Sequence, residues 1–255
     1  IEMKFPAGMR PATLEERRIF YTEEFDEKRA KRWVRSFVKV DTGRHSGIVK
    51  PGMKPKLLML KPWRELRERV LHYLPEDVYY DRNRYRSLNL CANCRIFFRK
   101  WRGAYCWWKC PNFTGQELAF DVDPENVNLG RKRDSIYSFT EEEFEETRLR
   151  AIELYEWLRE RFRNVIAVYS GRGFHLVVQD REAELLSMKE REKLVERLPP
   201  KLQEIVDPWV TRGNIRLLRL PYTLHGLVSR VVTPLKRKDM ERDDLLYRFK
   251  PKFLD

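Results

Sequence analysis

Apolar and polar residues follow two different periods along this chain, and together they predict both helices and strands. A Thr-x-x-Glu capping box before apolar residues at helical spacing predicts helices over about 13–37 and 140–163. Shorter amphipathic stretches predict helices over 62–73 and 183–198. Residues 41–56 are rich in Gly, Pro and basic side chains, so we expect a loop there.

Short apolar runs bounded by turn residues predict the strands, which we expect over 117–123, 164–170, 174–179 and 215–220. The second and third runs flank a Gly-Arg-Gly turn and therefore form a hairpin. Because helices and strands mix along the chain, the fold class is α/β or mixed α+β. We expect residues 1–255 to form a single domain.

The chain is strongly basic, since 52 Lys and Arg residues against 39 Asp and Glu residues give a net charge of +13. This surplus favours a polyanionic partner, most often nucleic acid, and a charged surface typical of thermophiles is the alternative. Hydrophobic residues make up 42% of the chain, which is enough for a packed core. No long apolar run and no secretory signal are visible, so we expect a cytoplasmic protein without a membrane partner.

All four cysteines lie within one short segment, in the pattern C-x2-C followed by C-x3-C: Cys91, Cys94, Cys106 and Cys110. Four thiolates at this spacing predict a structural Zn2+ ion in an inserted zinc-knuckle module over 85–113. Two disulfides or unrelated buried thiols are the alternative. Basic and aromatic residues between the cysteines suit a single strand of nucleic acid. Alternatively, Trp107 and Trp108 pack around the metal.

A pair of carboxylates marks the strand predicted at 117–123. Asp121 and Asp123 are two residues apart, so both side chains point to one face of the strand while the apolar residues point to the other. Such a pair is stabilised by a hard divalent cation, Mg2+ or Mn2+, and two ions of this kind can align a hydroxyl with a nucleotide phosphate.

Two further segments offer anion-binding groups. The first, SGRGFH at 170–175, combines a glycine turn with hydroxyl, guanidinium and imidazole donors, and an ordinary glycine hairpin is the alternative. The second contains Arg216, Arg219 and His225. Alternation along a strand places Arg216 and Arg219 on opposite faces, so both reach one ligand only if the strand twists or ends there.

Three segments in this order resemble the archaeo-eukaryotic primase superfamily, which comprises the small catalytic subunits of primases and the plasmid or viral primase-polymerases. The matching strings are FDVD at 120–123, YSGRGFH at 169–175 and DPWVTRGNIRLLRLPYTLH at 207–225. The resemblance implies an α/β catalytic fold in which helices flank a central sheet that carries the carboxylates. In archaeal small subunits, by contrast, the zinc motif follows the acidic pair, and a Lys stands where Leu227 is here; Arg230 is a candidate replacement.

The resemblance also implies a DNA primase or primase-polymerase, which is a nucleotidyltransferase acting in DNA replication. Its expected partners are single-stranded DNA template, primer and nucleoside triphosphates, with a helicase or an accessory primase domain outside this chain. The implied ligands of two catalytic Mg2+ or Mn2+ ions are Asp121, Asp123 and Asp207. The implied nucleotide-binding residues are Ser170, Arg172, His175, Arg216, Arg219 and His225.

Two other functions share some of these features. A two-metal nuclease would use the same carboxylates and basic surface, but it does not need a triphosphate cradle. A zinc-containing module that only binds nucleic acid would leave the acidic residues with a structural role. An elongation assay on a primed template separates the three functions, because the strand is lengthened, shortened or unchanged.

Overall fold

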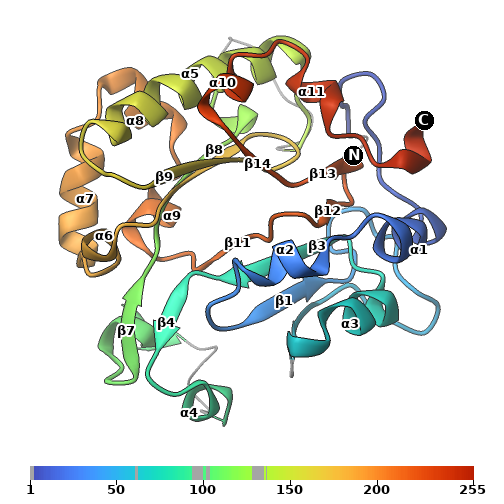
Figure 1. Cartoon of the computed structure of the whole chain (residues 1–255), viewed down its shortest axis with the longest axis horizontal. Helices are drawn as coiled ribbons and strands as arrows, with labels where there is room; N and C mark the ends of the chain where they lie inside the picture. The colour runs from blue at the N-terminus through green and yellow to red at the C-terminus, as the bar shows by residue number, and fades with distance from the viewer. Residues whose placement is uncertain (1–2, 61–62, 94–99, 102–103, 128–134, 136) are drawn as a thin grey trace.

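The computed structural model describes the chain with six short gaps, and the described residues are 3–60, 63–93, 100–101, 104–127, 135 and 137–255. Its two halves are each built on a four-stranded antiparallel sheet (Figure 1). The first sheet has the order β14-β9-β10-β8, formed by Thr233–Leu235, Val165–Tyr169, Phe174–Val178 and Leu118–Val122. The second sheet has the order β11-β3-β1-β2, formed by Leu217–Arg219, Asp77–Asp81, Val38–Asp41 and Leu57–Leu60.

The mixed α+β class is therefore confirmed, but the expectation of one central sheet is wrong for the described residues. Most of the second sheet lacks the alternation that marks a strand. β3 reads D-V-Y-Y-D and is buried at nearly every position, so its polar residues hide the pattern. The strand expected at 215–220 does exist, and it joins this second sheet through β3.

Helices cover the outer faces of both sheets (Figure 1). Over the first sheet lie α5 (Glu141–Arg159), α8 (Pro200–Ile205) and α10 (Arg237–Met240). Beside the second sheet lie α1 (Leu14–Glu23), α2 (Glu27–Lys31) and α3 (Leu66–Tyr73), with η1 (Trp63–Glu65) leading into α3. The remaining helices are α4 (Leu88–Asn93), α6 (Arg181–Glu184), α7 (Met188–Glu196), α9 (Pro208–Arg212), α11 (Leu245–Arg248), η2 (Cys106–Lys109), η3 (Pro124–Asn126) and η4 (Lys252–Leu254).

Two predicted helices are each divided in the structure, because a new cap interrupts them. The helix expected over 13–37 ends at Glu23, and Asp26 caps the separate α2 by accepting from the Arg29 N–H. The helix expected over 183–198 is divided into α6 and α7, because Ser187 forms a capping box with Glu190. None of the described helices is long and apolar enough to cross a membrane.

Three hairpins complete the fold: β4 (Asn83–Tyr85) with β7 (Phe113–Gln116), β5 (Lys100–Trp101) with β6 (Ala104–Tyr105), and β12 (Leu224–His225) with β13 (Arg230–Val231). The β4/β7 hairpin and α4 project from one end of the molecule (Figure 1). They carry the segment that contains the cysteines.

The two halves share hydrophobic packing, and this sharing decides where the acidic strand faces. Leu118, Phe120 and Val122 of β8 point into the core of the first half, under α5. Ala119, on the other face of β8, packs in the core of the second half. Because alternate residues of a strand share a face, Asp121 lies on the face of Ala119 and is directed toward the second half.

Candidate active site

The three predicted acidic residues converge where β8 ends. Asp121 lies in β8, and Asp123, two residues later, lies just after the strand and precedes η3. Val122 and Val206 form an isolated antiparallel bridge, and the Asp207 N–H donates to the Asp121 carbonyl oxygen at 3.0 Å. Residues 84 positions apart in the chain are therefore held side by side by backbone hydrogen bonds.

Asp121 lies in an environment that disfavours its negative charge. Oδ1 of Asp121 and Oδ1 of Asp123 are buried, and neither accepts a hydrogen bond from the described residues. Burial, followed by repulsion from Asp123, raises the pKa of Asp121 well above its usual range. A buried carboxylate oxygen without a partner is costly, and a divalent cation is the group that would stabilise it.

The SGRGFH turn packs directly against the acidic pair and against His225. Gly171 has φ +103°, and a Cβ on it would come within 2.7 Å of the His225 ring. A Cβ on Gly173 would lie 2.2 Å from the Val122 carbonyl oxygen and 2.5 Å from Asp123 Oδ1. Both glycines are thus required by close approach, and the turn joins the three segments singled out in the sequence.

Inside this turn, the hydroxyl and the imidazole have specific partners. Ser170 Oγ accepts from the Gly173 N–H at 3.1 Å and so closes the turn. His175 stands opposite Asp121 on the neighbouring strand, and its Nε2 lies 3.3 Å from Asp121 Oδ1, outside hydrogen-bonding geometry. Burial, with Arg219 nearby, lowers the pKa of His175 to about 3, so this imidazole is neutral at pH 7.

Arg172 provides the first cation of the site. Its guanidinium lies 4.0 Å from Asp123 Oδ2, forms an ion pair with Glu125, and stands over the Tyr137 ring at 5.5 Å. Burial and the charge of Asp123 raise the pKa of Glu125. Glu125 was missed in the sequence because it follows the strand, outside the alternating pattern.

Arg219 provides the second cation, and Asp77 orients it. Arg219 Nε donates to Asp77 Oδ1 at 3.0 Å, and His225 Nδ1 lies 2.8 Å from the same oxygen. Burial would raise the pKa of Asp77, but Arg219 and then His225 outweigh it and hold this pKa well below its usual range. Burial lowers the pKa of His225. The fixed positive charge of the site therefore comes from the two arginines rather than from the histidines.

Arg216 and Arg219 reach the same face of β3, because β11 begins only at Leu217. Arg216 lies before the strand, so strand alternation does not apply to it. Its Nη1 lies 3.5 Å from Asp81 Oδ2 and donates to the Tyr85 hydroxyl at 3.2 Å, and its guanidinium stands 5.2 Å from the Trp107 ring centroid. Asp81 and Asp77 occupy one face of β3.

Arg230 does not replace the missing lysine of the family, so that expectation is wrong. It is fully buried, and its guanidinium donates to the carbonyl oxygens of Leu246, Gly8 and Ser229. Leu227 is buried too. Arg230 therefore joins the two ends of the chain to β13 and does not face the carboxylates.

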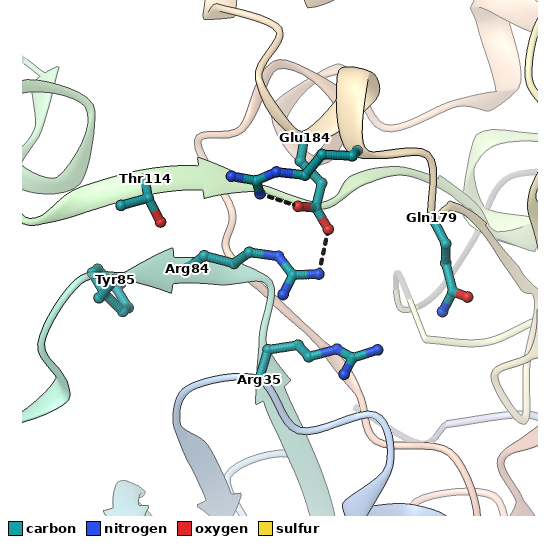
Figure 2. Close-up of a pocket in the computed structure, with 7 residues that line it drawn as sticks. Arg35, Arg84, Tyr85, Thr114, Gln179 and Glu184 are labelled. Atoms are coloured by element: carbon teal, nitrogen blue, oxygen red, sulfur yellow. Dashed lines mark hydrogen bonds and ion pairs between the residues drawn. The ribbon is translucent and has the colours of Figure 1, made fainter.

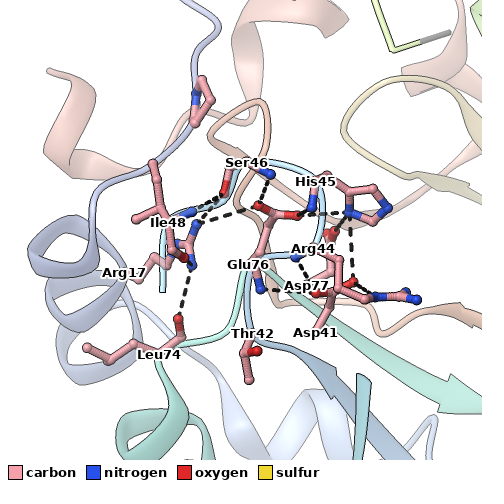
Figure 3. Close-up of polar contacts among 12 residues, drawn as sticks. Arg17, Asp41, Thr42, Arg44, His45, Ser46, Ile48, Leu74, Glu76 and Asp77 are labelled. Atoms are coloured by element: carbon pink, nitrogen blue, oxygen red, sulfur yellow. Dashed lines mark hydrogen bonds and ion pairs between the residues drawn. The ribbon is translucent and has the colours of Figure 1, made fainter. Parts of the chain in front are cut away.

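A second acidic cluster borders the site, formed by Asp41, His45 and Glu76 (Figure 3). Its oxygens already have partners. Glu76 accepts from the His45 ring at 2.8 Å and from the Ser46 N–H at 2.8 Å, and Asp41 Oδ1 accepts from the Arg44 N–H at 2.9 Å. The hydrogen bond to Glu76 raises the pKa of His45. We interpret this cluster as a set of structural hydrogen bonds that hold the loop after β1 in place.

The cysteine-containing segment is described in part. Cys94 and the Cys106 side chain lie outside the described residues, while Cys91 is buried and Cys110 is partly buried. Asn112 donates to Cys91 Sγ at 3.0 Å, and the Phe113 N–H donates to the Cys110 carbonyl oxygen. Asn112, two residues after Cys110, therefore lies beside Cys91, and zinc stays a prediction.

Trp107 and Trp108 pack onto the body of the protein. Trp107 is 7% exposed, and the Nε1 atoms of both rings donate to the Gly213 carbonyl oxygen, at 3.4 and 3.0 Å. Gly213 ends α9, the helix that Asp207 caps. The structure therefore favours packing over base stacking for these two tryptophans, but they pack against Gly213, and the expected packing around a metal stays a prediction.

A basic pocket of about 410 Å³ lies between the β4/β7 hairpin and α6 (Figure 2). Arg84 and Arg181 both bind Glu184, at 2.5 and 2.6 Å. Arg35 lines the same pocket, and Figure 2 shows it below Arg84. The other residues that line it are Tyr85, Thr114 and Gln179. Three guanidinium groups against one carboxylate leave the pocket positively charged.

Known proteins similar to this chain fall into one group. No family model matches it. A DNA primase small subunit-like protein of Archaeoglobus fulgidus is 39% identical over 274 residues, which cover 100% of this chain and 95% of that protein. The DNA primase small subunit of Pyrobaculum calidifontis is 26% identical over 70% of this chain and 66% of its own length. That of Pyrococcus furiosus is 29% identical over 73% of this chain and 49% of its own length.

The fold has a counterpart among solved structures. The polymerase domain of Mycobacterium tuberculosis ligase D, in complex with DNA, superposes with a TM-score of 0.54 over 92% of this chain and 84% of that domain, at 14% identity. The sequence likeness to the Archaeoglobus protein spans both chains almost completely, and the three motifs of the resemblance meet at one site. The chain therefore belongs to the archaeo-eukaryotic primase superfamily.

Proposed function

We propose that this protein is a DNA primase-polymerase that adds nucleotides to a strand under the direction of a single-stranded template. The observation that carries the proposal is the convergence of Asp121, Asp123 and Asp207 beside Arg172 and Arg219. The relatives named as primase small subunits support the same reaction class. Carboxylates next to fixed cations suit a reaction between a polyanionic triphosphate and a hydroxyl.

The acidic trio fits a pair of divalent ions, Mg2+ or Mn2+, because two of its buried oxygens have no partner among the described residues. Asp121, Asp123 and Asp207 would hold these ions. When bound, two such ions supply the positive charge that activates a hydroxyl and neutralises a leaving pyrophosphate. Asp77 and Glu125 would not ligate them, because each already binds an arginine.

In the proposed reaction, the 3′-hydroxyl oxygen bonds to the α-phosphorus of the incoming nucleotide, the bond from that phosphorus to the oxygen bridging to the β-phosphate breaks, pyrophosphate leaves, and the hydroxyl proton passes to solvent water. Arg172 and Arg219 would offset the charge of the triphosphate. His175 and His225, as neutral imidazoles, would donate single N–H bonds, and Ser170 keeps the turn closed. Arg216 would extend the cationic surface toward the cysteine segment.

We assign the cysteine segment to a structural zinc knuckle and the basic pocket to a phosphate of the template strand. Asn112 supports the first assignment, since an N–H donor to sulfur stabilises a thiolate. Arg35 supports the second, because its guanidinium makes no hydrogen bond or ion pair within the described residues. Phosphate contacts of this kind hold a strand without reading its sequence.

The test is primer extension on a single-stranded template with Mg2+ or Mn2+, using deoxynucleotides and ribonucleotides in separate reactions. We expect a lengthened strand with the wild-type protein. Asp121→Asn should abolish extension and leave template binding within about twofold, because the variant keeps the basic surface. Asp243→Asn, at an exposed position away from the trio, is the matched control and should extend normally. Shortening of the strand would instead identify a nuclease, and an unchanged strand would identify a binding module.

A further inference from the structure

One tryptophan is exposed where the others are covered. Trp209 is 55% exposed, and its ring contacts no aromatic, cationic or hydrogen-bonding partner among the described residues. The other tryptophans with described side chains do have partners: Trp33 contacts Tyr80, Trp107 and Trp108 bind Gly213, and Trp157 lies under Arg161. An indole exposed to water lacks the stabilisation that burial gives, so a bound partner that covers Trp209 would be stabilised by the contact.

Trp209 lies at the acidic trio. Its backbone N–H donates to Asp207 Oδ1 at 2.8 Å, and Trp209 follows this proposed metal ligand by two residues. The Ile215 N–H donates to the Trp209 carbonyl oxygen at 3.1 Å, and Ile215 is 39% exposed. An exposed aromatic residue and an exposed aliphatic residue are therefore joined through the backbone beside Asp207, and we refer to this pair as the platform.

The charge around this platform favours a nucleic acid. Arg212 is on the same helix, Arg216 follows Ile215, and the chain carries a net charge of +13. Arg212 is paired with Glu192 at 2.7 Å, so it contributes to the field more than to a direct contact. An aromatic face beside a basic surface is the arrangement that holds unpaired bases by stacking.

We propose that Trp209, supported by Ile215, stacks on an unpaired base of the template strand next to the nucleotidyl-transfer site. This assignment rests on the proposed function for the choice of strand. Stacking is independent of base identity, because every base presents a π-face, so the platform would hold a template of any sequence. It would fix the template base beside the carboxylates while the next nucleotide pairs.

The test compares the binding of primed templates by the wild-type protein, Trp209→Ala and Trp209→Phe, measured by fluorescence anisotropy without divalent ions. Because aromatic–base stacking contributes directly to affinity, Trp209→Ala should weaken binding about tenfold, and Trp209→Phe should restore most of it. The matched control is Trp157→Phe on α5, whose ring is covered by Arg161, and this variant should bind like the wild type. Equal binding by wild type and Trp209→Ala would overturn the proposal.

A second measurement locates the base. Templates carrying one abasic residue at successive overhang positions should bind the wild-type protein weakly at a single position, and Trp209→Ala should be insensitive to that position. The same weakening in both proteins, or self-association of the wild type lost in Trp209→Ala, would refute stacking. This binding assay needs no catalysis. An inactive wild-type protein would therefore contradict the proposed function while leaving the stacking result intact.

Discussion

Glu117, at the start of the strand that carries the acidic pair, allows a sharp test of the buried electrostatics. Glu117 is 8% exposed, and its Oε1 accepts a hydrogen bond from the Tyr80 hydroxyl at 2.6 Å. Burial raises the pKa of Glu117 from 4.5 to about 7, although Tyr80 and Arg82 oppose this. We expect Glu117→Gln to keep the Tyr80 hydrogen bond, because the amide oxygen replaces the carboxylate oxygen.

The direction follows from proton binding. Between pH 4.5 and 7 the folded protein binds more protons at Glu117 than the unfolded chain does, so the free energy of unfolding falls as pH rises through this window. The difference between the two pKa values corresponds to about 3 kcal/mol at 1.36 kcal/mol per pKa unit, and roughly 2–3 kcal/mol of it falls between pH 5 and 8.

Urea unfolding of the wild type and of Glu117→Gln at about pH 5 and pH 8 measures this effect. We expect the wild type to lose about 2–3 kcal/mol more than the variant does over that interval. The comparison between the two proteins cancels the other titrating groups. Parallel pH profiles would refute the reasoning, since they would mean that Glu117 ionises in the folded protein as it does in water.

The remaining predictions concern the basic pocket and the cysteine segment. Arg35→Ala should weaken single-strand binding and reduce the slope of log affinity against log salt by about 1, whereas Arg18→Ala, on α1 and paired with Glu15, should leave that slope unchanged. Trp107→Ala should cost about 3–5 kcal/mol of unfolding free energy, with little change in binding per folded molecule, because the ring is buried. A large loss of affinity at full stability would contradict it. Cys91→Ser should release zinc in metal analysis and lower the melting temperature, and wild-type protein without zinc would reject the knuckle.

Much of the first half of the fold could be predicted from the sequence. β8 carries acidic and apolar residues in alternation, β9 and β10 are short apolar runs on either side of a glycine turn, and α5 begins at a complete capping box. The second half was harder to see because its strands contain buried charges. Asp77 and Asp81 of β3 pair with Arg219 of β11 and with Arg216 just before it, more than 130 residues later in the chain. Local patterns do not contain such distant pairs.

The candidate site shows the same division. The alternation along β8 predicted one apolar face and one face that carries Asp121, and the family resemblance pointed to Asp207. The close approach of Gly171 and Gly173 to their neighbours could not be predicted, since it depends on the pairing of β8 with β10. The role of Asp77 as the partner of Arg219 is likewise a property of the second sheet.

The contact of Gly213 with the cysteine segment has a consequence for mechanics. Its carbonyl oxygen accepts from Trp107, Trp108 and Gln116 at one end of a five-residue helix, and Asp207 caps the other end. A helix this short behaves as a rigid rod about 7–8 Å long. A displacement of the two indoles would therefore shift α9 and the Asp207 carboxylate that caps it. Damage to the neighbouring thiols would then move an oxygen of a proposed metal ligand.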